Sequence, residues 1–128
     1  MWSAHSLACL LWFRAAPQLA EEARVDRLLL VAPPACEDLP EGAARFRNQT
    51  LDADAVRASV RDRIRIACSG SDPYNRAGAR ALYADPIGAD LDTIQGAGHI
   101  TPDTGYGPWP SLEEWCLRPE VVLRATGG

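Results

Sequence analysis

The residue with the clearest chemical potential is Ser6, which lies near the start of the chain between small residues. Ala4 and Ala8 flank it two positions away on either side, and an apolar run begins at Leu7. This small-x-Ser-x-small pattern is typical of a nucleophile elbow, a tight strand-to-helix turn that holds a serine hydroxyl above a sheet. The stricter motif has Gly at both flanking positions. A serine that caps an ordinary N-terminal helix is the alternative interpretation.

Two further residues stand where such a serine needs partners. Asp72 follows a predicted strand that ends at Cys68, and His99 follows a predicted strand that ends at Ile94. Because the chemistry of open parallel sheets gathers at the carboxyl ends of the strands, we expect these side chains to meet Ser6 there. Taken alone, Asp72 before Pro73 could form a plain Asx turn, and His99 could be structural. Their order along the chain, Ser then Asp then His, is that of an α/β-hydrolase triad and favours the catalytic interpretation.

Each of these residue types has a chemical reason to be present. A serine hydroxyl attacks a carbonyl only when a neighbouring base takes its proton, and a histidine imidazole such as that of His99 is the side chain best suited to accept that proton and later return it. A carboxylate such as that of Asp72 would fix the imidazole tautomer and stabilise the imidazolium. The backbone N–H of Leu7, the residue after the serine, is the expected oxyanion-hole donor. We expect the other histidine, His5, to pack in the elbow, since adjacent side chains leave the turn in different directions.

The elements expected to position these residues alternate between helix and strand. The first helix starts at Ser6 and is interrupted by Pro17. Asn75 and Ser111 are expected to cap later helices. The pattern predicts a doubly wound parallel α/β fold in a single domain, residues 1–128. The expected elements are helices over 6–23, 52–60, 75–84 and 111–117, and strands over 25–33, 61–68 and 91–94.

Composition excludes several classes of function. The chain has 128 residues, a net charge of −4 and no lysine among its thirteen basic residues, which excludes a Schiff-base or P-loop lysine. The arginines are scattered and form no basic patch in the sequence, so we expect no nucleic-acid partner. Four widely spaced cysteines and two histidines make no zinc site, and we expect reduced, buried thiols in a cytoplasmic protein. The apolar run over 7–13 is too short to span a membrane. Neither a metal nor a cofactor is implied.

Five stretches of the sequence resemble the small serine hydrolases of the retinoblastoma-binding-protein-9 and YdeN type. They are AHSLAC (4–9), LLVAPP (29–34), SGSDPYN (69–75), GAGHI (96–100) and TGYGPWP (104–110). The resemblance implies a three-layer α/β-hydrolase-like fold and hydrolysis of small ester or amide substrates. It places nucleophile, acid and base on Ser6, Asp72 and His99. It also suggests that Tyr106 and Trp109 line the rim of the site and touch substrate.

The sequence departs from this family at its start. Only Met1 to Ser3 stand for the strand before the elbow, and on the order of two βαβ units would normally precede it. We expect a start codon internal to a longer reading frame, with a true fragment as the alternative, and a sheet incomplete at its N-terminal side. One oxyanion-hole donor then has no residue to supply it. An exposed sheet edge would favour self-association. Ala8 is expected to crowd the first helix against a neighbouring strand.

Three functions therefore remain open. The first is a serine hydrolase that acts on small esters or amides through an acyl-enzyme. The second is a non-catalytic binding or scaffold protein that uses the exposed sheet edge. The third is an inactive fragment of a hydrolase.

Overall fold

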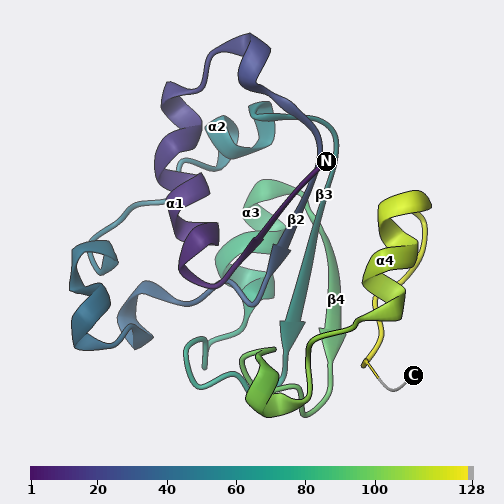
Figure 1. Cartoon of the computed structure of the whole chain (residues 1–128). Helices are drawn as coiled ribbons and strands as arrows, with labels where there is room; N and C mark the ends of the chain where they lie inside the picture. The colour runs from purple at the N-terminus through teal and green to yellow at the C-terminus, as the bar shows by residue number, and fades with distance from the viewer. Residues whose placement is uncertain (127–128) are drawn as a thin grey trace.

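A single parallel sheet organises the chain, as a computed structural model of residues 1–126 shows (Figure 1). Its four strands lie side by side in chain order, so each crossover moves one position along the sheet. All three strand pairs are parallel. The strands are β1 (Trp2–His5), β2 (Val25–Val31), β3 (Val60–Ser69) and β4 (Asp90–Ile94). The predicted parallel α/β fold is therefore confirmed.

The helices cover the two faces of this sheet unequally. Three lie on one face and α4 lies alone on the other, beside β4 (Figure 1). The α-helices are α1 (Leu7–Ala15), α2 (Ala53–Ala58), α3 (Asp85–Ile87) and α4 (Pro110–Leu117). A π-helical turn over 80–84 leads into α3, and short 3₁₀ turns fill the segments over 16–23 and 36–46. No helix within residues 1–126 is long and apolar enough to cross a membrane.

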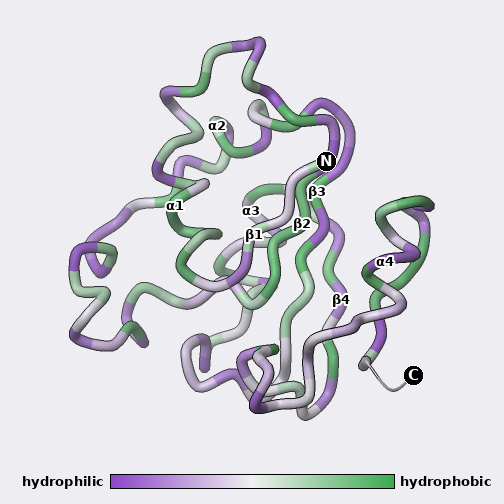
Figure 2. Tube along the Cα trace, viewed as in Figure 1, coloured by the Kyte–Doolittle hydropathy of each residue, from purple (hydrophilic) through white to green (hydrophobic). Residues whose placement is uncertain are grey.

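The core follows from the two-residue alternation of β2, which is hydrophobic along most of its length (Figure 2). Leu28 and Leu30 point to the face covered by α1, α2 and α3, whereas Leu29 and Val31 point to the face of α4. A strand that is buried on both faces reads as a continuous apolar run, which is why LLLV could be recognised as a central strand.

The predicted starts of several elements are confirmed, whereas the first helix and α2 end earlier than the predicted residues 23 and 60. Asp52 caps α2, since its side chain accepts a hydrogen bond from the N–H of Ala55 at 3.0 Å. The first helix ends at Ala15, and Pro17 lies in the 3₁₀ turn that follows, so the predicted interruption is present. A strand does precede the elbow, because Trp2–His5 pair in register with residues 28–31 of β2.

Three local predictions are wrong. Asn75 does not cap a helix, because its side chain donates to the carbonyl of Pro33 and accepts from the N–H of Gly78. The helical turns there begin only at residue 80. Ser111 lies inside α4, which begins one residue earlier, and its hydroxyl accepts from the N–H of Arg124. Ala8 is exposed, so within residues 1–126 its methyl does not crowd α1 against a strand.

A buried ion pair joins β3 to β4 on the α4 side of the sheet. Arg65 donates to Asp92 at 2.8 Å, and both side chains are less than a tenth exposed. The same carboxylate of Asp92 accepts the backbone N–H of Leu123 at 2.8 Å. Asp90, which lies 3.7 Å from Arg65, is half exposed. The pair therefore fixes the segment after α4 against the strand that leads to His99.

We predict that Asp92→Ala lowers the free energy of unfolding by about 3 kcal/mol or more, because it leaves Arg65 buried without its main partner. Chemical denaturation measures this loss. The matched control is Asp26→Ala, which breaks an exposed pair with Arg61 and should cost less than about 1 kcal/mol. Equal losses in the two variants would contradict the assignment.

Candidate active site

Ser6 forms the whole turn between β1 and α1. Its backbone has φ 59° and ψ −124°, a conformation that residues other than glycine rarely adopt. Holding a residue there costs on the order of 1–3 kcal/mol and requires support from its surroundings. Part of that support comes from β2, because the N–H of Ser6 donates to the carbonyl of Val31 at 2.9 Å. This single-residue strained turn is the geometry that the small-x-Ser-x-small pattern predicts.

The structure brings the three predicted site residues into one hydrogen-bonded chain. Ser6 Oγ lies 2.7 Å from His99 Nε2, and His99 Nδ1 lies 2.9 Å from Asp72 Oδ2. A carboxylate can only accept, so Nδ1 carries the ring proton and donates it to Asp72. Nε2 is then free to accept the hydroxyl proton of Ser6. The imidazole is thus held in the tautomer that a general base needs.

Asp72 is held in place by the loop that follows β3. Its side chain is 3% exposed, and Oδ1 accepts the backbone N–H of Tyr74 at 2.9 Å. The carbonyl of Asp72 accepts the N–H of Asn75. This is the Asx turn that the Asp-Pro pair predicts, and the same carboxylate also faces His99. The two interpretations of Asp72 are therefore compatible, since Oδ1 closes the turn while the imidazole Nδ1 lies 2.9 Å from Oδ2 and 3.1 Å from Oδ1.

His99 is positioned mainly through its backbone. His5 Nε2 donates to the carbonyl of His99 at 3.0 Å, so His5 supports the loop that carries the imidazole. The preceding residue, Gly98, donates its N–H to the hydroxyl of Ser71 at 3.1 Å. The ring of Tyr74 meets the imidazole edge-on, with centroids 4.7 Å apart. Together with these contacts, Asp72 and Ser6 hold the imidazole between them.

A cavity of about 240 Å³ opens beside the serine hydroxyl. It is lined by Ser6, Leu7, Pro34, Leu39, Pro40, Tyr74 and His99. Leu7 is the first residue of α1, so its N–H has no acceptor within the helix and stands next to the serine. A helix N-terminus also favours developing negative charge. The position suits the predicted oxyanion-hole donor.

Tyr106 and Trp109 lie elsewhere. They pack edge to face on each other and line a second hollow of about 310 Å³ beside β1, together with Ser3 and His5. Both rings are buried, and the indole N–H of Trp109 donates to the carbonyl of Arg124. The cavity at Ser6 is not lined by either residue. Their contact with substrate stays a prediction.

The thiol near the start of α1 is not reactive. Cys9 lies one turn into α1, fully buried, and its thiol points at the carbonyls of Ala4 and Val31. Burial raises the pKa of Cys9 to about 12, so the reactive thiolate is absent at neutral pH. All four cysteines are free thiols, of which Cys9 and Cys68 are buried, whereas Cys36 and Cys116 are less buried than predicted. Within residues 1–126, no cluster of three or more His, Cys, Asp or Glu side chains could hold a metal ion.

The sequence did not reveal which neighbours support the site. Tyr74 was visible only as part of the stretch that follows Asp72, although it binds the carboxylate and covers the imidazole. An ion pair between Asp38 and Arg76 joins the two loops around the cavity. No pattern in the sequence indicated it. Such a pair depends on the contact of two loops that are 38 residues apart.

Comparisons with known proteins agree with this arrangement. A family model described as serine hydrolase matches residues 2–117. The crystal structure of the ydeN gene product from B. subtilis superposes with a TM-score of 0.74 at 22% identity, so the likeness is one of fold. The match covers 90% of this chain and 62% of that one, and the chain thus spans less than two thirds of that protein's length. No curated protein matches the chain significantly.

The loop that carries His99 yields a test of its geometry. Gly98 has φ +58°, and a Cβ placed on it would lie 2.7 Å from the Thr104 methyl carbon. Gly98→Ala should therefore destabilise the protein beyond the roughly 1 kcal/mol that a left-handed alanine costs, and should slow the reaction of Ser6 with a fluorophosphonate. Denaturation and labelling rates measure the two effects.

Two further variants serve as controls for Gly98→Ala. Gly96→Ala has a similar φ of +65° with no atom within 4 Å, and should show the backbone cost alone. Adding Thr104→Ser to Gly98→Ala removes the obstructing methyl but keeps the hydroxyl bonds to Thr101, and should restore the Gly96→Ala level. A double variant no better than Gly98→Ala would contradict the steric explanation.

Proposed function

The chain belongs to the serine hydrolase family, and from that premise we propose that it cleaves small ester or amide substrates through an acyl-enzyme. Ser6 is the nucleophile, His99 the general base and acid, and Asp72 the residue that orients the imidazole. The observation that carries this proposal is the hydrogen-bonded chain from the strained Ser6 through His99 to a buried Asp72. No cofactor or metal takes part in it.

The first half of the reaction forms the acyl-enzyme. Ser6 Oγ attacks the substrate carbonyl while His99 Nε2 takes the hydroxyl proton, which gives a tetrahedral oxyanion and an imidazolium. The N–H of Leu7 donates to that oxyanion. Asp72 stabilises the imidazolium without taking its proton. Collapse of the intermediate breaks the bond to the leaving group, which departs with the proton from His99.

The second half returns the enzyme to its starting state. His99 takes a proton from water as the water oxygen attacks the acyl carbon, and the second tetrahedral intermediate expels Ser6 Oγ. The imidazolium gives its proton back to the serine, and a carboxylic acid leaves. The same residues thus serve both steps with their roles reversed.

We propose a cytoplasmic location. All four thiols are free, and two of them, Cys9 and Cys68, are buried, as suits a reducing compartment.

The triad is tested by two substitutions. Ser6→Ala should abolish labelling by a fluorophosphonate and ester turnover, and Asp72→Asn should lower kcat roughly 10⁴-fold because the imidazole then favours the wrong tautomer. Mass spectrometry of the labelled peptide and steady-state kinetics measure these losses. As a control, Asp103→Asn removes an exposed carboxylate from the 3₁₀ turn Pro102–Thr104, which follows His99, and should leave labelling and turnover unchanged. Full activity in the Ser6→Ala protein would refute the assignment.

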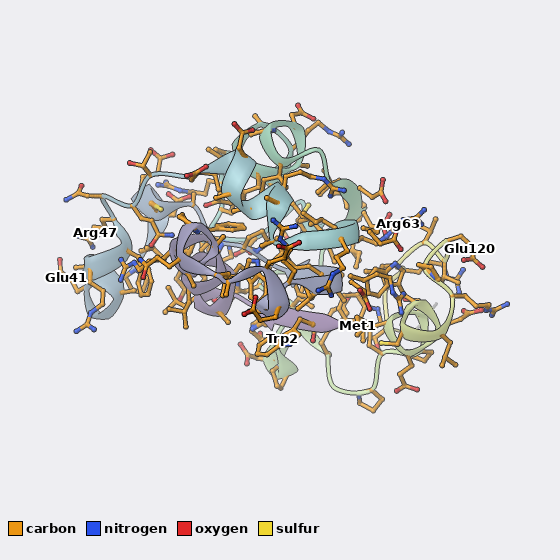
Figure 3. The ribbon with its side chains drawn as sticks, turned by 90° about the horizontal axis from the view of Figure 1, so that it is seen from above. Met1, Trp2, Glu41, Arg47, Arg63 and Glu120 are labelled. Carbon is orange, nitrogen blue, oxygen red and sulfur yellow. The ribbon has the colours of Figure 1, made fainter. Side chains whose placement is uncertain are left out.

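A second role, binding through the sheet edge, is supported by β1. This strand pairs only with β2, so the described residues leave the hydrogen-bonding groups of its other edge without a strand neighbour. Trp2 is 57% exposed and lies at the rim of the molecule beside the ribbon of β1 (Figure 3). The strand carries no acidic or arginine side chain that would oppose pairing. We propose that a second copy pairs its own β1 with this edge.

Light scattering after gel filtration over a wide range of protein concentration tests the pairing. The wild-type chain should shift from monomer to dimer as concentration rises, and Trp2→Lys should remain monomeric because a lysine at the edge opposes strand addition. Leu117→Lys places the same charge on an 84% exposed residue of α4 and should dimerise like the wild type. A wild-type chain that stays monomeric throughout would exclude the proposal.

A further inference from the structure

The cavity beside Ser6 has walls of one chemical kind. Apart from the serine and His99, it is lined by two leucines, two prolines and a tyrosine: Leu7, Leu39, Pro34, Pro40 and Tyr74. Leu39 is only 5% exposed and is part of the buried core, so this wall is continuous with the protein interior. None of the lining residues is Arg, Asp or Glu. A charged group that entered would lose its hydration and gain no partner.

From this lining we infer that the cavity is a specificity pocket for an uncharged, apolar substituent on the carbonyl that Ser6 attacks. The inference rests on the proposed hydrolase function and names its substrate class. The cavity of about 240 Å³ exceeds the roughly 150 Å³ that accommodates benzene in an apolar protein cavity, so a short alkyl chain or one ring fits. Esters and amides with a charge at that distance from the carbonyl are excluded.

The two walls of the pocket are tied to each other, which gives the pocket a fixed shape. Asp38 immediately precedes Leu39, and its carboxylate accepts the backbone N–H of Arg76 at 2.8 Å and its Nε at 2.9 Å. On the same side, the N–H of Ala35 donates to the carbonyl of Tyr74 at 2.8 Å. The segment that carries Leu39 is therefore attached to the loop that carries Tyr74 at two points.

This tie holds under ordinary assay conditions. The guanidinium and backbone N–H of Arg76 lower the pKa of the Asp38 carboxyl, so the contribution of the pair is present above the usual aspartate range and is lost only in acid. A pocket that is already formed spends no binding energy on ordering its walls. Each additional buried CH₂ of the substrate should then raise kcat/KM by about three- to fourfold until the pocket is full.

Matched pairs of esters test the inference, with the Ser6→Ala protein as the background rate. On the acyl side, 4-nitrophenyl valerate is compared with 4-nitrophenyl hemisuccinate, which places a carboxylate at similar length. On the leaving-group side, 3,3-dimethylbutyl acetate is compared with acetylcholine, its cationic counterpart. We expect the neutral member to be preferred at least tenfold in kcat/KM in one pair, and that pair identifies which substituent the pocket holds.

Substitution of Leu39 in the pocket wall should change which esters the protein prefers. If the acyl pair shows the preference, Leu39→Arg should lower kcat/KM for the valerate at least tenfold and raise it for the hemisuccinate. If the leaving-group pair shows it, the same variant should lower kcat/KM for 3,3-dimethylbutyl acetate at least tenfold. Leu117→Arg, on an exposed face of α4, should change none of these values. Leu39→Ala removes bulk without adding charge and should shift the acyl-chain length with the highest kcat/KM toward longer chains. This variant provides the test if the arginine variant does not fold.

The outcomes separate the two claims. If fluorophosphonate labels Ser6 but neutral and charged esters react within twofold of each other, the pocket inference is overturned and the hydrolase proposal stands. The same holds if both Leu39 variants keep the wild-type preference. Absence of both labelling and turnover would overturn the hydrolase proposal and this inference with it.

Discussion

The site depends on one strained residue. Ser6 connects a parallel strand to a helix without any loop, and it can do so only in a backbone conformation that disfavours a side chain. The interactions that offset this strain lie on both sides of the turn. β1 is hydrogen-bonded to β2 over four register positions, and α1 packs Leu10 and Phe13 into the core. Because the turn has no freedom of its own, the hydroxyl direction follows from the sheet and the helix.

The partners of Ser6 reach it from loops that are fixed to one another. The loops after β3 and β4 meet where Gly98 donates to Ser71 and where Asp72 binds His99. The loop after β2 joins them through the bond from Asn75 to the carbonyl of Pro33. Parallel strands end at the same edge of the sheet, so all of these loops emerge within reach of the elbow. Precision at the serine is thus a property of three loops that hold each other.

The sequence was informative wherever a local pattern had one physical solution. The apolar run of β2 and the small residues around Ser6 each allow few conformations, so the strands, their parallel order and the meeting of Ser6 with Asp72 and His99 could be predicted. Predictions failed where a side chain forms a hydrogen bond with a residue far away in the sequence. Asn75 donates to a carbonyl 42 residues away and does not begin the helix predicted there. Ser111 bonds to Arg124 instead of capping α4. The apolar cavity could not be foreseen, because its lining residues come from four separate stretches of the chain.

The position of β1 at the sheet edge links the two proposed roles. The strand that precedes Ser6 is hydrogen-bonded to another strand on one side only among residues 1–126, and its burial is low, with Trp2, Ser3 and His5 all exposed. His5, its last residue, also supports the carbonyl of His99. A second strand paired with the free edge of β1 would therefore fix Ser6 and His99 together, through the elbow on one side and His5 on the other. If the chain associates at this edge as proposed, association and reactivity at the serine would be coupled, since both depend on how firmly β1 is held.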